Sequence, residues 1–331
     1  MTHKPVIAMA LSRAVYQMMF TPQDLRHLEP HAQLIGPAES GSGKQIAPLL
    51  RGATVAITGW GTARLDDSLL DGCTSLKLVA HSAGSVKGIV TESLYDRGIR
   101  VTTAAAANAA PVAETTVAMM VLMLKRIPWL FASKGERAIL KEIGPIRELR
   151  ELNVGLISAS RVGREVIRLL KNYPRLRVLV YDPYLTPEHA DELGVELATL
   201  EEVCACDVVS VHAPAIAQTR HMLSARTLAL LPDHAVLINT SRGSLIDEAA
   251  LVAEVRRRPL YVYLDVTDPE PPAPDSPLRS EPNILLTPHI AGGMNQGRRD
   301  MGRLAVAETL RFLRGEPLWH EVTREMLPTQ A

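Results

Sequence analysis

The sequence predicts an α/β fold with parallel sheets, divided over two doubly wound domains. Short apolar runs rich in β-branched residues alternate with helical patterns along the chain, which is the pattern of parallel strands joined by helices. A length of 331 residues is too great for one typical core, and a hydrophobic content of 47% is ample for burial. Both observations favour two globular domains.

The expected strands are separated by helical patterns. They cover residues 6–11, 54–58, 76–80, 100–103, 154–157, 177–181, 207–211, 235–239, 261–265 and 284–287. The sequence of residues 113–126 is apolar almost without interruption, so this helix should be buried between layers rather than lie on the surface. A last helix is expected near residues 299–315.

Charge and composition exclude several classes of partner. Lys+Arg and Asp+Glu each number 36, so no net field favours nucleic acid or an acidic membrane. The apolar run near the N-terminus is too short for a signal segment, and no stretch approaches about 18 uninterrupted apolar residues. We expect a cytoplasmic protein with small-molecule partners, and neither nucleic acid nor a membrane among them.

The cysteines, Cys73, Cys204 and Cys206, are few and odd in number, as expected in a reducing compartment. The closely spaced pair Cys204 and Cys206 has no second pair of ligands nearby. It also precedes the strand expected at residues 207–211, so a helix-to-strand turn is the stronger interpretation. No metal site is predicted.

Residues 153–166 follow the strand, turn and helix order of the Rossmann dinucleotide fingerprint G-x-G-x-x-G. Ser158 and Ser160 stand at the first two glycine positions, and only Gly163 keeps the glycine, which serves helix-to-strand packing. Ser160 carries a Cβ where the pyrophosphate would approach, although its hydroxyl and the helix N-terminal amides could still hydrogen-bond it. We therefore expect weakened rather than abolished cofactor binding, through Ser160, Arg161, Val162 and Gly163.

Asp182 ends the next expected strand, 182 − 163 = 19 residues after the last glycine, at the ribose-binding position. A carboxylate there accepts hydrogen bonds from a 2′-hydroxyl and repels a 2′-phosphate, and no basic residue follows in 183–188. The sequence therefore favours NAD(H) over NADP(H). An exposed turn aspartate before proline is the alternative interpretation.

Three side chains suited to redox chemistry on an acid follow late in the chain: Arg242, Glu270 and His289. A planar guanidinium can hold a substrate carboxylate through two parallel hydrogen bonds. An imidazole can protonate an oxygen on which negative charge develops, and an adjacent carboxylate would stabilise its protonated form. Considered singly, each residue type is more often structural. Their positions in turns beside apolar strands favour the catalytic interpretation.

These three segments resemble the C-terminal signature of the D-isomer-specific 2-hydroxyacid dehydrogenases, which include enzymes acting on phosphoglycerate, D-lactate, and glyoxylate or hydroxypyruvate. Arg242 follows an Asn-Thr-Ser turn, Glu270 precedes a proline in Asp-Val-Thr-Asp-Pro-Glu-Pro, and His289 lies in Thr-Pro-His. The spacings, 270 − 242 = 28 and 289 − 270 = 19 residues, also fit. The resemblance implies that Arg242 anchors the substrate, Glu270 tunes the imidazole and His289 exchanges the proton.

The resemblance also implies a domain layout. Residues 104–296 would form the NAD-binding domain, and residues 1–103 with 297–331 a discontinuous substrate domain. Both would be Rossmann-like or flavodoxin-like, with the substrate in an interdomain cleft. Further residues are then expected at the cofactor, namely Thr116, Ala213, Pro214, Thr240, Asp265 and Gly292, and at the substrate, namely Ala83, Gly84 and Ser85 with Arg242. A homodimer is implied as well.

The expected function is hydride transfer between NAD and a small D-2-hydroxy acid or 2-oxo acid. The serines at positions 158 and 160 leave open an alternative from another class, a non-catalytic NAD(H)-binding sensor or corepressor on the same scaffold. They also leave open the loss of nucleotide binding altogether.

Overall fold

The computed structural model describes residues 4–135, 137–141 and 143–327. The chain forms two compact units, of which unit 1 comprises Met1–Asn108 and Gly293–Ala331 and unit 2 comprises Ala109–Gly292. The predicted division fell after residues 103 and 296. Residues 1–3 and 328–331 of the predicted substrate domain lie outside the described residues.

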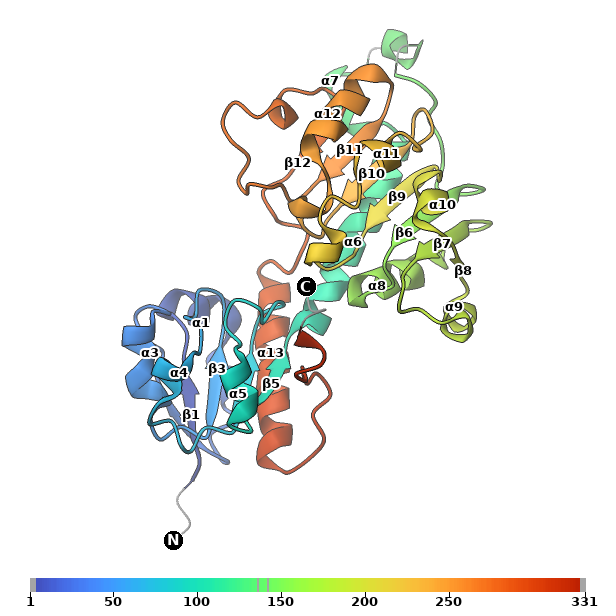
Figure 1. Cartoon of the computed structure of the whole chain (residues 1–331). Helices are drawn as coiled ribbons and strands as arrows, with labels where there is room; N and C mark the ends of the chain where they lie inside the picture. The colour runs from blue at the N-terminus through green and yellow to red at the C-terminus, as the bar shows by residue number, and fades with distance from the viewer. Residues whose placement is uncertain (1–3, 136, 142, 328–331) are drawn as a thin grey trace. The chain divides into compact units, whose positions relative to one another are not determined.

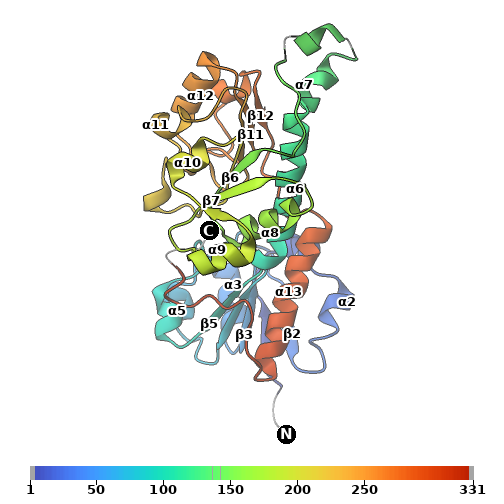
Figure 2. The ribbon, with the colours of Figure 1, turned by 90° about the vertical axis from the view of Figure 1, so that its right-hand side faces the viewer.

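Unit 1 is built on a parallel five-stranded sheet in the order β2-β1-β3-β4-β5 (Figure 1). Its strands are β1 (Val6–Met9), β2 (Gln33–Ile35), β3 (Val55–Thr58), β4 (Leu78–His81) and β5 (Arg100–Thr103). Its helices are α1 (Arg13–Met19), α2 (Pro22–Leu25), α3 (Gly43–Leu50), α4 (Asp67–Leu70), α5 (Glu92–Asp96) and α13 (Gln296–Leu313). Figure 2 shows α13, from the C-terminal part of the chain, lying along this N-terminal sheet.

Unit 2 contains a parallel seven-stranded sheet in the order β12-β11-β10-β9-β6-β7-β8. Its strands are β6 (Asn153–Ile157), β7 (Arg177–Tyr181), β8 (Glu196–Leu197), β9 (Val208–Val211), β10 (Val236–Asn239), β11 (Tyr261–Leu264) and β12 (Ile284–Leu286). Its α-helices are α6 (Ala105–Leu124, shared with unit 1), α7 (Ile127–Ala132), α8 (Arg161–Leu170), α9 (Pro187–Leu193), α10 (Leu200–Cys204), α11 (Ala225–Leu228) and α12 (Glu248–Arg257). The described residues also form the 3-10 helices η1 (Arg137–Lys141), η2 (Ala217–Thr219), η3 (Gly243–Leu245) and η4 (Pro277–Arg279).

Alternating side chains of the strands enter two separate cores, one on each face of the sheet. In β10, Val236 and Ile238 belong to one buried cluster, and Leu237 belongs to the other. In β4, Leu78 and Val79 are divided in the same way. A strand alternates its side chains between the two faces, so a sheet that is apolar on both must be covered by helices on both. The prediction of doubly wound parallel sheets is confirmed.

The direction in which strands are added reverses between β6 and β9 in unit 2. Loops at the carboxyl ends of strands diverge at such a switch point, which is where doubly wound sheets bind ligands. Helix α8 begins directly after β6, and the loops after β10, β11 and β12 leave the same edge because the strands are parallel. The fold thus gathers the fingerprint turn and the three late side chains along one edge.

The structure departs from the expected elements at a few points. The short strands β2 and β8, of 3 and 2 residues, were not predicted, because so few residues show no clear alternation. Helix α6 begins at Ala105 rather than at residue 113, because the alanine-rich start favours helix and Pro111 lies within its first turns. Helix α13 covers Gln296–Leu313 rather than residues 299–315.

Helix α6 is long and apolar enough, by length and composition, to cross a membrane. A single helix of this kind is weak evidence for a membrane span, since buried core helices can have the same length and composition. In this structure Val117, Met120 and Met123 of α6 lie in the buried cluster that also holds residues of β6 and β10. The predicted burial of this helix is confirmed along that face.

A buried histidine supports the turn that follows β4. His81 is 3% exposed, its Nδ1 lies 3.0 Å from Thr58 Oγ1, and its ring also hydrogen-bonds the backbone of Ser85. Burial lowers the pKa of His81 to about 4, so the ring is neutral near pH 7. The neutral imidazole therefore links β3 to the turn at residues 82–87.

The depressed pKa of His81 makes unit 1 sensitive to acid. An unfolded histidine binds a proton near pH 6.5, whereas folded His81 does so only near pH 4, so stability falls as the pH decreases through this window. The contribution of His81 to the free energy of unfolding that is lost across this window is on the order of 3 kcal/mol. Urea unfolding at pH 7.5 and pH 5 should show a smaller loss in His81→Gln than in the wild type. His27→Gln, at an exposed histidine, is the control. Identical losses in His81→Gln and the wild type would contradict this assignment.

Candidate functional site

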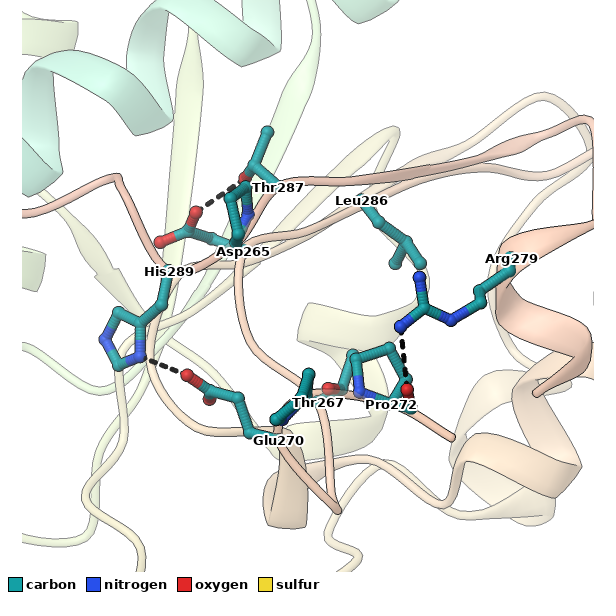
Figure 3. Close-up of a pocket in the computed structure, with 10 residues that line it drawn as sticks. Asp265, Thr267, Glu270, Pro272, Arg279, Leu286, Thr287 and His289 are labelled. Atoms are coloured by element: carbon teal, nitrogen blue, oxygen red, sulfur yellow. Dashed lines mark hydrogen bonds and ion pairs between the residues drawn. The ribbon is translucent and has the colours of Figure 1, made fainter. Parts of the chain in front are cut away.

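Glu270 and His289 form a close pair in unit 2. Glu270 Oε1 lies 2.6 Å from His289 Nδ1, and Figure 3 shows the two side chains pointing toward each other. Their side chains are 40% and 48% exposed, so the pair faces solvent and can be reached by a small molecule. The structure therefore brings together two of the three late residues, separated by 19 positions in the chain.

The loop that carries His289 is fixed by the buried carboxylate of Asp265. Leu264 pairs with Leu286 in the parallel sheet, so Asp265 and Thr287 follow side by side. Asp265 Oδ1 accepts hydrogen bonds from Thr287 Oγ1 at 2.5 Å and from the amide of Ile290 at 2.8 Å. Its Oδ2 accepts one from the amide of Ala291 at 2.8 Å. With 1% exposure, this side chain acts as an anchor for the loop.

His289 itself has a φ of 55°, in the left-handed region that side chains other than glycine rarely adopt. The strain, of roughly 1–2 kcal/mol, must be offset by the surrounding structure. The amide of His289 donates to the carbonyl oxygens of Asp265 at 2.9 Å and Thr287 at 3.0 Å, which hold this conformation. The unusual backbone sets the direction in which the imidazole leaves the loop.

Arg242 provides a half-buried cation near this pair. Its Nη1 donates to the carbonyl of Ser241 at 2.6 Å, and no carboxylate lies within ion-pair distance of it in the part of the chain that the structure describes. Burial lowers the pKa of the Arg242 guanidinium, and the negative charge of Glu270 acts in the opposite direction. A partly desolvated guanidinium without an anion is suited to bind an anionic ligand.

The turn of Arg242 packs against the loop of Glu270 through a glycine. A Cβ on Gly243 would lie 2.0 Å from the carbonyl carbon of Thr267, so any larger residue would force the two segments apart. Asn239 reinforces the turn, since its Nδ2 donates to the carbonyl of Arg242 at 2.8 Å and its Oδ1 accepts from the amide of Ser241 at 3.0 Å. The sequence Asn-Thr-Ser-Arg-Gly therefore has a direct structural reason.

A cavity of about 390 Å³ adjoins the Glu270–His289 pair within unit 2. The guanidinium of Arg279 shapes its wall by donating to the carbonyls of Pro272 at 2.7 Å and Ala273 at 3.0 Å (Figure 3). Its lining consists of Asp265, Thr267, Glu270, Pro271, Pro272, Arg279, Leu286, Thr287, Pro288 and His289. The proline-rich segment thus forms an ordered wall beside the pair.

The fingerprint turn replaces two glycines with serines that make defined hydrogen bonds. Ser158 has a φ of 81°, which confirms that a glycine-type conformation occurs here, and its hydroxyl donates to Asp182 Oδ2 at 3.0 Å. Ser160 caps α8 by accepting from the amide of Gly163 at 3.3 Å. A Cβ on Gly163 would lie 2.2 Å from the carbonyl oxygen of Ser158, so this third glycine is required for packing.

The start of α8 retains the features that hold an anionic group. Capping by Ser160 satisfies one amide, whereas the amides of Arg161 and Val162 belong to the first turn, where helices lack internal acceptors. Arg161 Nη1 is buried and has no hydrogen-bond partner, and burial lowers the pKa of this guanidinium. These unsatisfied donors fit the diphosphate of a dinucleotide.

Asp182 lies at the end of β7 and is already engaged by protein donors. Besides the hydroxyl of Ser158, its Oδ2 accepts from the amide of Ala159 at 2.8 Å, and its Oδ1 accepts from the amide of Tyr184 at 2.9 Å. A carboxylate has about four acceptor positions, so capacity remains for a ribose hydroxyl. The Ser158 hydroxyl takes one of them.

The remaining predicted cofactor residues differ in their exposure. Thr116 Oγ1 lies 3.0 Å from Thr240 Oγ1, and both are buried, at 0% and 7% exposure. Ala213 is buried and Pro214 is half-buried after β9, and half-buried Gly292 ends unit 2. For these residues and for Asp265, contact with the cofactor stays a prediction.

The predicted substrate turn, Ala83, Gly84 and Ser85, lies in unit 1, whereas Arg242 and His289 lie in unit 2. Thr103 Oγ1 donates to the carbonyl of Ala83 at 3.1 Å and also contacts that of Gly84. A Cβ on Gly84 would meet no atom within 4 Å, so this position opens outward. Substrate binding by the turn stays a prediction.

Metal ligation has no support among the residues that the structure describes, since they contain no group of three or more His, Cys, Asp or Glu suited to a metal ion. Burial raises the pKa of Cys204 to about 12 and that of Cys206 to about 11, which disfavours the thiolate form that metals require. Both thiols are buried and unpaired.

Two interactions at the site escaped sequence reasoning. The anchoring role of Asp265 depends on the register of β11 and β12, which places it beside Thr287. The signal for it would have been the pairing of the ends of β11 and β12, which places Asp265 beside Thr287. The bond between Ser158 and Asp182 joins the ends of β6 and β7, 24 residues apart. The available signal was a hydroxyl side chain, Ser158, at a glycine position of the fingerprint, together with the carboxylate of Asp182 at the end of the next strand.

The profile of the family described as "D-isomer specific 2-hydroxyacid dehydrogenase, NAD binding domain" matches residues 117–291. Among curated proteins, the chain is 29% identical over 306 residues to D-3-phosphoglycerate dehydrogenase of Methanocaldococcus jannaschii, covering 89% of the chain and 57% of that protein. It is also 29% identical over 278 residues to glyoxylate reductase of Aeropyrum pernix, covering 80% of the chain and 82% of that protein. The chain spans about half the length of the phosphoglycerate dehydrogenases that it matches.

Solved structures agree in fold. The apo form of D-mandelate dehydrogenase of Rhodotorula graminis matches with a TM-score of 0.84 and 20% identity, covering 97% of this chain and 98% of that one. At this identity the likeness concerns the fold alone. The matched profile is that of an NAD-binding domain, which confirms the predicted cofactor, NAD. Because that profile covers more than half of the sequence, the chain belongs to the D-isomer specific 2-hydroxyacid dehydrogenase family.

Proposed function

We propose that this protein is an NAD-dependent dehydrogenase that interconverts a small D-2-hydroxy acid and its 2-oxo acid. The observation that carries the proposal is the Glu270–His289 pair, at 2.6 Å, with the charge of Glu270 also acting on Arg242. Bound NAD would supply the hydride chemistry. The residues of the chain would bind the acid, orient it and move its proton.

The proton would move at His289 Nε2. When Nδ1–H donates to the carboxylate of Glu270, the tautomer of the imidazole is fixed and Nε2 is left to face the substrate oxygen. The protonated ring donates during reduction, and the neutral ring accepts during oxidation. Glu270 would hold the ring in this orientation through its bond to Nδ1.

The substrate carboxylate would be held by Arg242. Its guanidinium is half-buried and has no carboxylate partner among the described residues, so a bound acid would satisfy it. Two parallel hydrogen bonds would fix the carbonyl carbon in one orientation. The similarity to D-3-phosphoglycerate dehydrogenase and to glyoxylate reductase supports a 2-oxo or 2-hydroxy acid as the substrate class.

Substitution of the imidazole tests the catalytic assignment. His289→Ala should lower kcat for NADH-dependent reduction of glyoxylate, hydroxypyruvate or pyruvate by about 10²- to 10⁴-fold, because the proton donor is lost. Glu270→Gln should lower kcat as well, while NADH affinity is retained in both variants. NADH oxidation is followed at 340 nm over a panel of small 2-oxo acids.

His189→Ala, at an exposed histidine on α9, serves as the control and should keep full activity. Undiminished turnover in His289→Ala would remove this residue from the mechanism. Tight NADH binding without turnover of any acid in the panel would favour the sensor or corepressor alternative, which the comparisons do not support.

The fingerprint turn, referred to below as the nucleotide turn, leads to a prediction about cofactor affinity. Ser158→Gly removes a side chain from a φ of 81° and frees Asp182 Oδ2 from the serine hydroxyl, so it should tighten NADH binding several-fold. Asp182→Ala should weaken the binding of NADH. It should also reduce the difference in affinity between NADH and NADPH, because the repulsion of a 2′-phosphate is lost. Fluorescence titration with both cofactors gives the affinities. Asp191→Ala, at an exposed carboxylate on α9, is the control. Weaker NADH binding by Ser158→Gly would contradict the inferred competition.

We also propose that the protein is a homodimer. Large apolar side chains of α6, α7 and the segment that follows are exposed, namely Leu122, Phe131, Leu140 and Ile146, with Phe131 at 79%. Covering such side chains stabilises association. A cytoplasmic location is proposed from the three free cysteines.

Sedimentation measures the assembly. Phe131→Glu should shift the protein from dimer to monomer, because a buried charge would oppose association. Tyr184→Glu changes a side chain that is 76% exposed elsewhere in unit 2 and should leave the dimer intact. A monomeric wild-type protein would refute the proposal.

A further inference from the structure

Unit 1 contains a polar cavity of about 480 Å³ that the catalytic assignment does not use. It lies between the end of α1 and the beginning of α13, and it is lined by Gln17, Met18, Asn295, Gln296, Arg298 and Arg299. Both ionisable residues in this lining are arginines. We propose that this cavity binds a phosphate group, either as free phosphate or as the phosphoryl group of a small phosphomonoester.

Arg298 is the first argument for an anion. Its Nε is buried and has no hydrogen-bond partner, and its Nη1 and Nη2 meet only the sulfur atoms of Met18, at 3.3 Å, and Met294, at 3.1 Å. Thioether sulfur is a weak acceptor, so the guanidinium has a buried Nε without a partner and no counter-charge among the described residues. An incoming anion would supply the missing acceptors.

The surroundings hold Arg298 in place without neutralising it. The guanidinium carbon lies 5.7 Å from the centre of the Trp60 ring, which is 40% exposed. Contact with an aromatic face and two thioethers orients the planar group. The side chain is therefore pre-organised for a ligand, which reduces the entropy lost on binding.

Arg299 supplies a second unpaired cation. Seven arginines of unit 1 have carboxylate partners, namely Arg13, Arg97, Arg100, Arg303, Arg311, Arg314 and Arg324, whereas Arg26, Arg51 and Arg64 have no ion pair among the described residues. Within the described residues, neither Arg298 nor Arg299 has one. The nearest acid in sequence, Asp300, pairs with Arg303 at 2.9 Å. Two neighbouring arginines without acidic partners thus face one polar cavity.

The beginning of α13 adds to this positive charge. This helix of 18 residues has no side-chain cap from Asn295 and no acidic residue in its first turn. The amide of Gly297 donates to the carbonyl of Met294 at 2.8 Å, and the helix dipole favours an anion at this end. The side-chain amides of Gln17 and Gln296 also line the cavity, so that donors are present in several directions, as a tetrahedral oxyanion requires.

Calorimetric titration with inorganic phosphate tests the site. The protein is first saturated with NAD, so that the nucleotide turn at α8 is filled and cannot take the added anion. Wild-type protein should bind phosphate saturably, and Arg298→Gln and Arg299→Gln should each weaken it by about tenfold or more. Arg314→Gln, at the other end of α13, is the matched control and should bind as the wild type does.

A second readout is local. Arg298 lies over Trp60, so phosphate should change the tryptophan fluorescence of the wild type and leave Trp60→Phe unchanged, even if an arginine variant folds poorly. Glycerol 3-phosphate is titrated in parallel. Tighter binding than that of phosphate assigns the site to a phosphomonoester, and equal or weaker binding assigns it to free phosphate.

Three results would overturn the proposal. They are the absence of saturable phosphate binding at millimolar concentration, equal binding by the Arg298→Gln/Arg299→Gln double variant, and a response reproduced by chloride at the same ionic strength. Since the titration does not involve turnover, it is independent of whether His289 acts as the catalytic acid.

Discussion

The buried carboxylate of Asp265 is the constraint on which the Glu270–His289 pair depends. It directly follows β11 and accepts hydrogen bonds from Thr287, Ile290 and Ala291 in the loop after β12. These bonds hold a segment in which His289 has a left-handed backbone, a conformation that costs energy in isolation. Glu270 lies in the loop that follows the same strand, β11. By holding the loop of His289, Asp265 therefore places the imidazole close to the carboxylate of Glu270.

The strand order of unit 2 explains why residues distant in sequence meet. Arg242, Glu270 and His289 follow β10, β11 and β12, which are neighbours in the parallel sheet. Parallel strands present their carboxyl ends at one edge, so the loops that follow them converge there. Gly243 tightens this convergence, since its missing side chain lets the arginine turn touch the backbone of Thr267.

The nucleotide turn shows how a fingerprint can change while its geometry is kept. Ser158 retains the positive φ of the glycine that it replaces, and its hydroxyl bonds to Asp182. Ser160 becomes the cap of α8, while Arg161 keeps a buried donor without a partner. The turn is therefore held by internal hydrogen bonds. A cofactor bound at this turn would share Asp182 with the protein, whereas the buried Nη1 of Arg161 would still be free to bind its diphosphate.

The sequence by itself determined the parallel α/β fold, because apolar periodicity and turn residues are local signals, and its late motifs indicated the NAD-binding family. It missed β2 and β8, whose few residues show no alternation, and it began α6 too late. Only the tertiary structure decided that Asp265 anchors a loop, that Ser158 reaches Asp182, and that Met18 meets Arg298 across 280 residues. Such contacts depend on strand register and helix packing, which bring together side chains that no spacing along the chain connects.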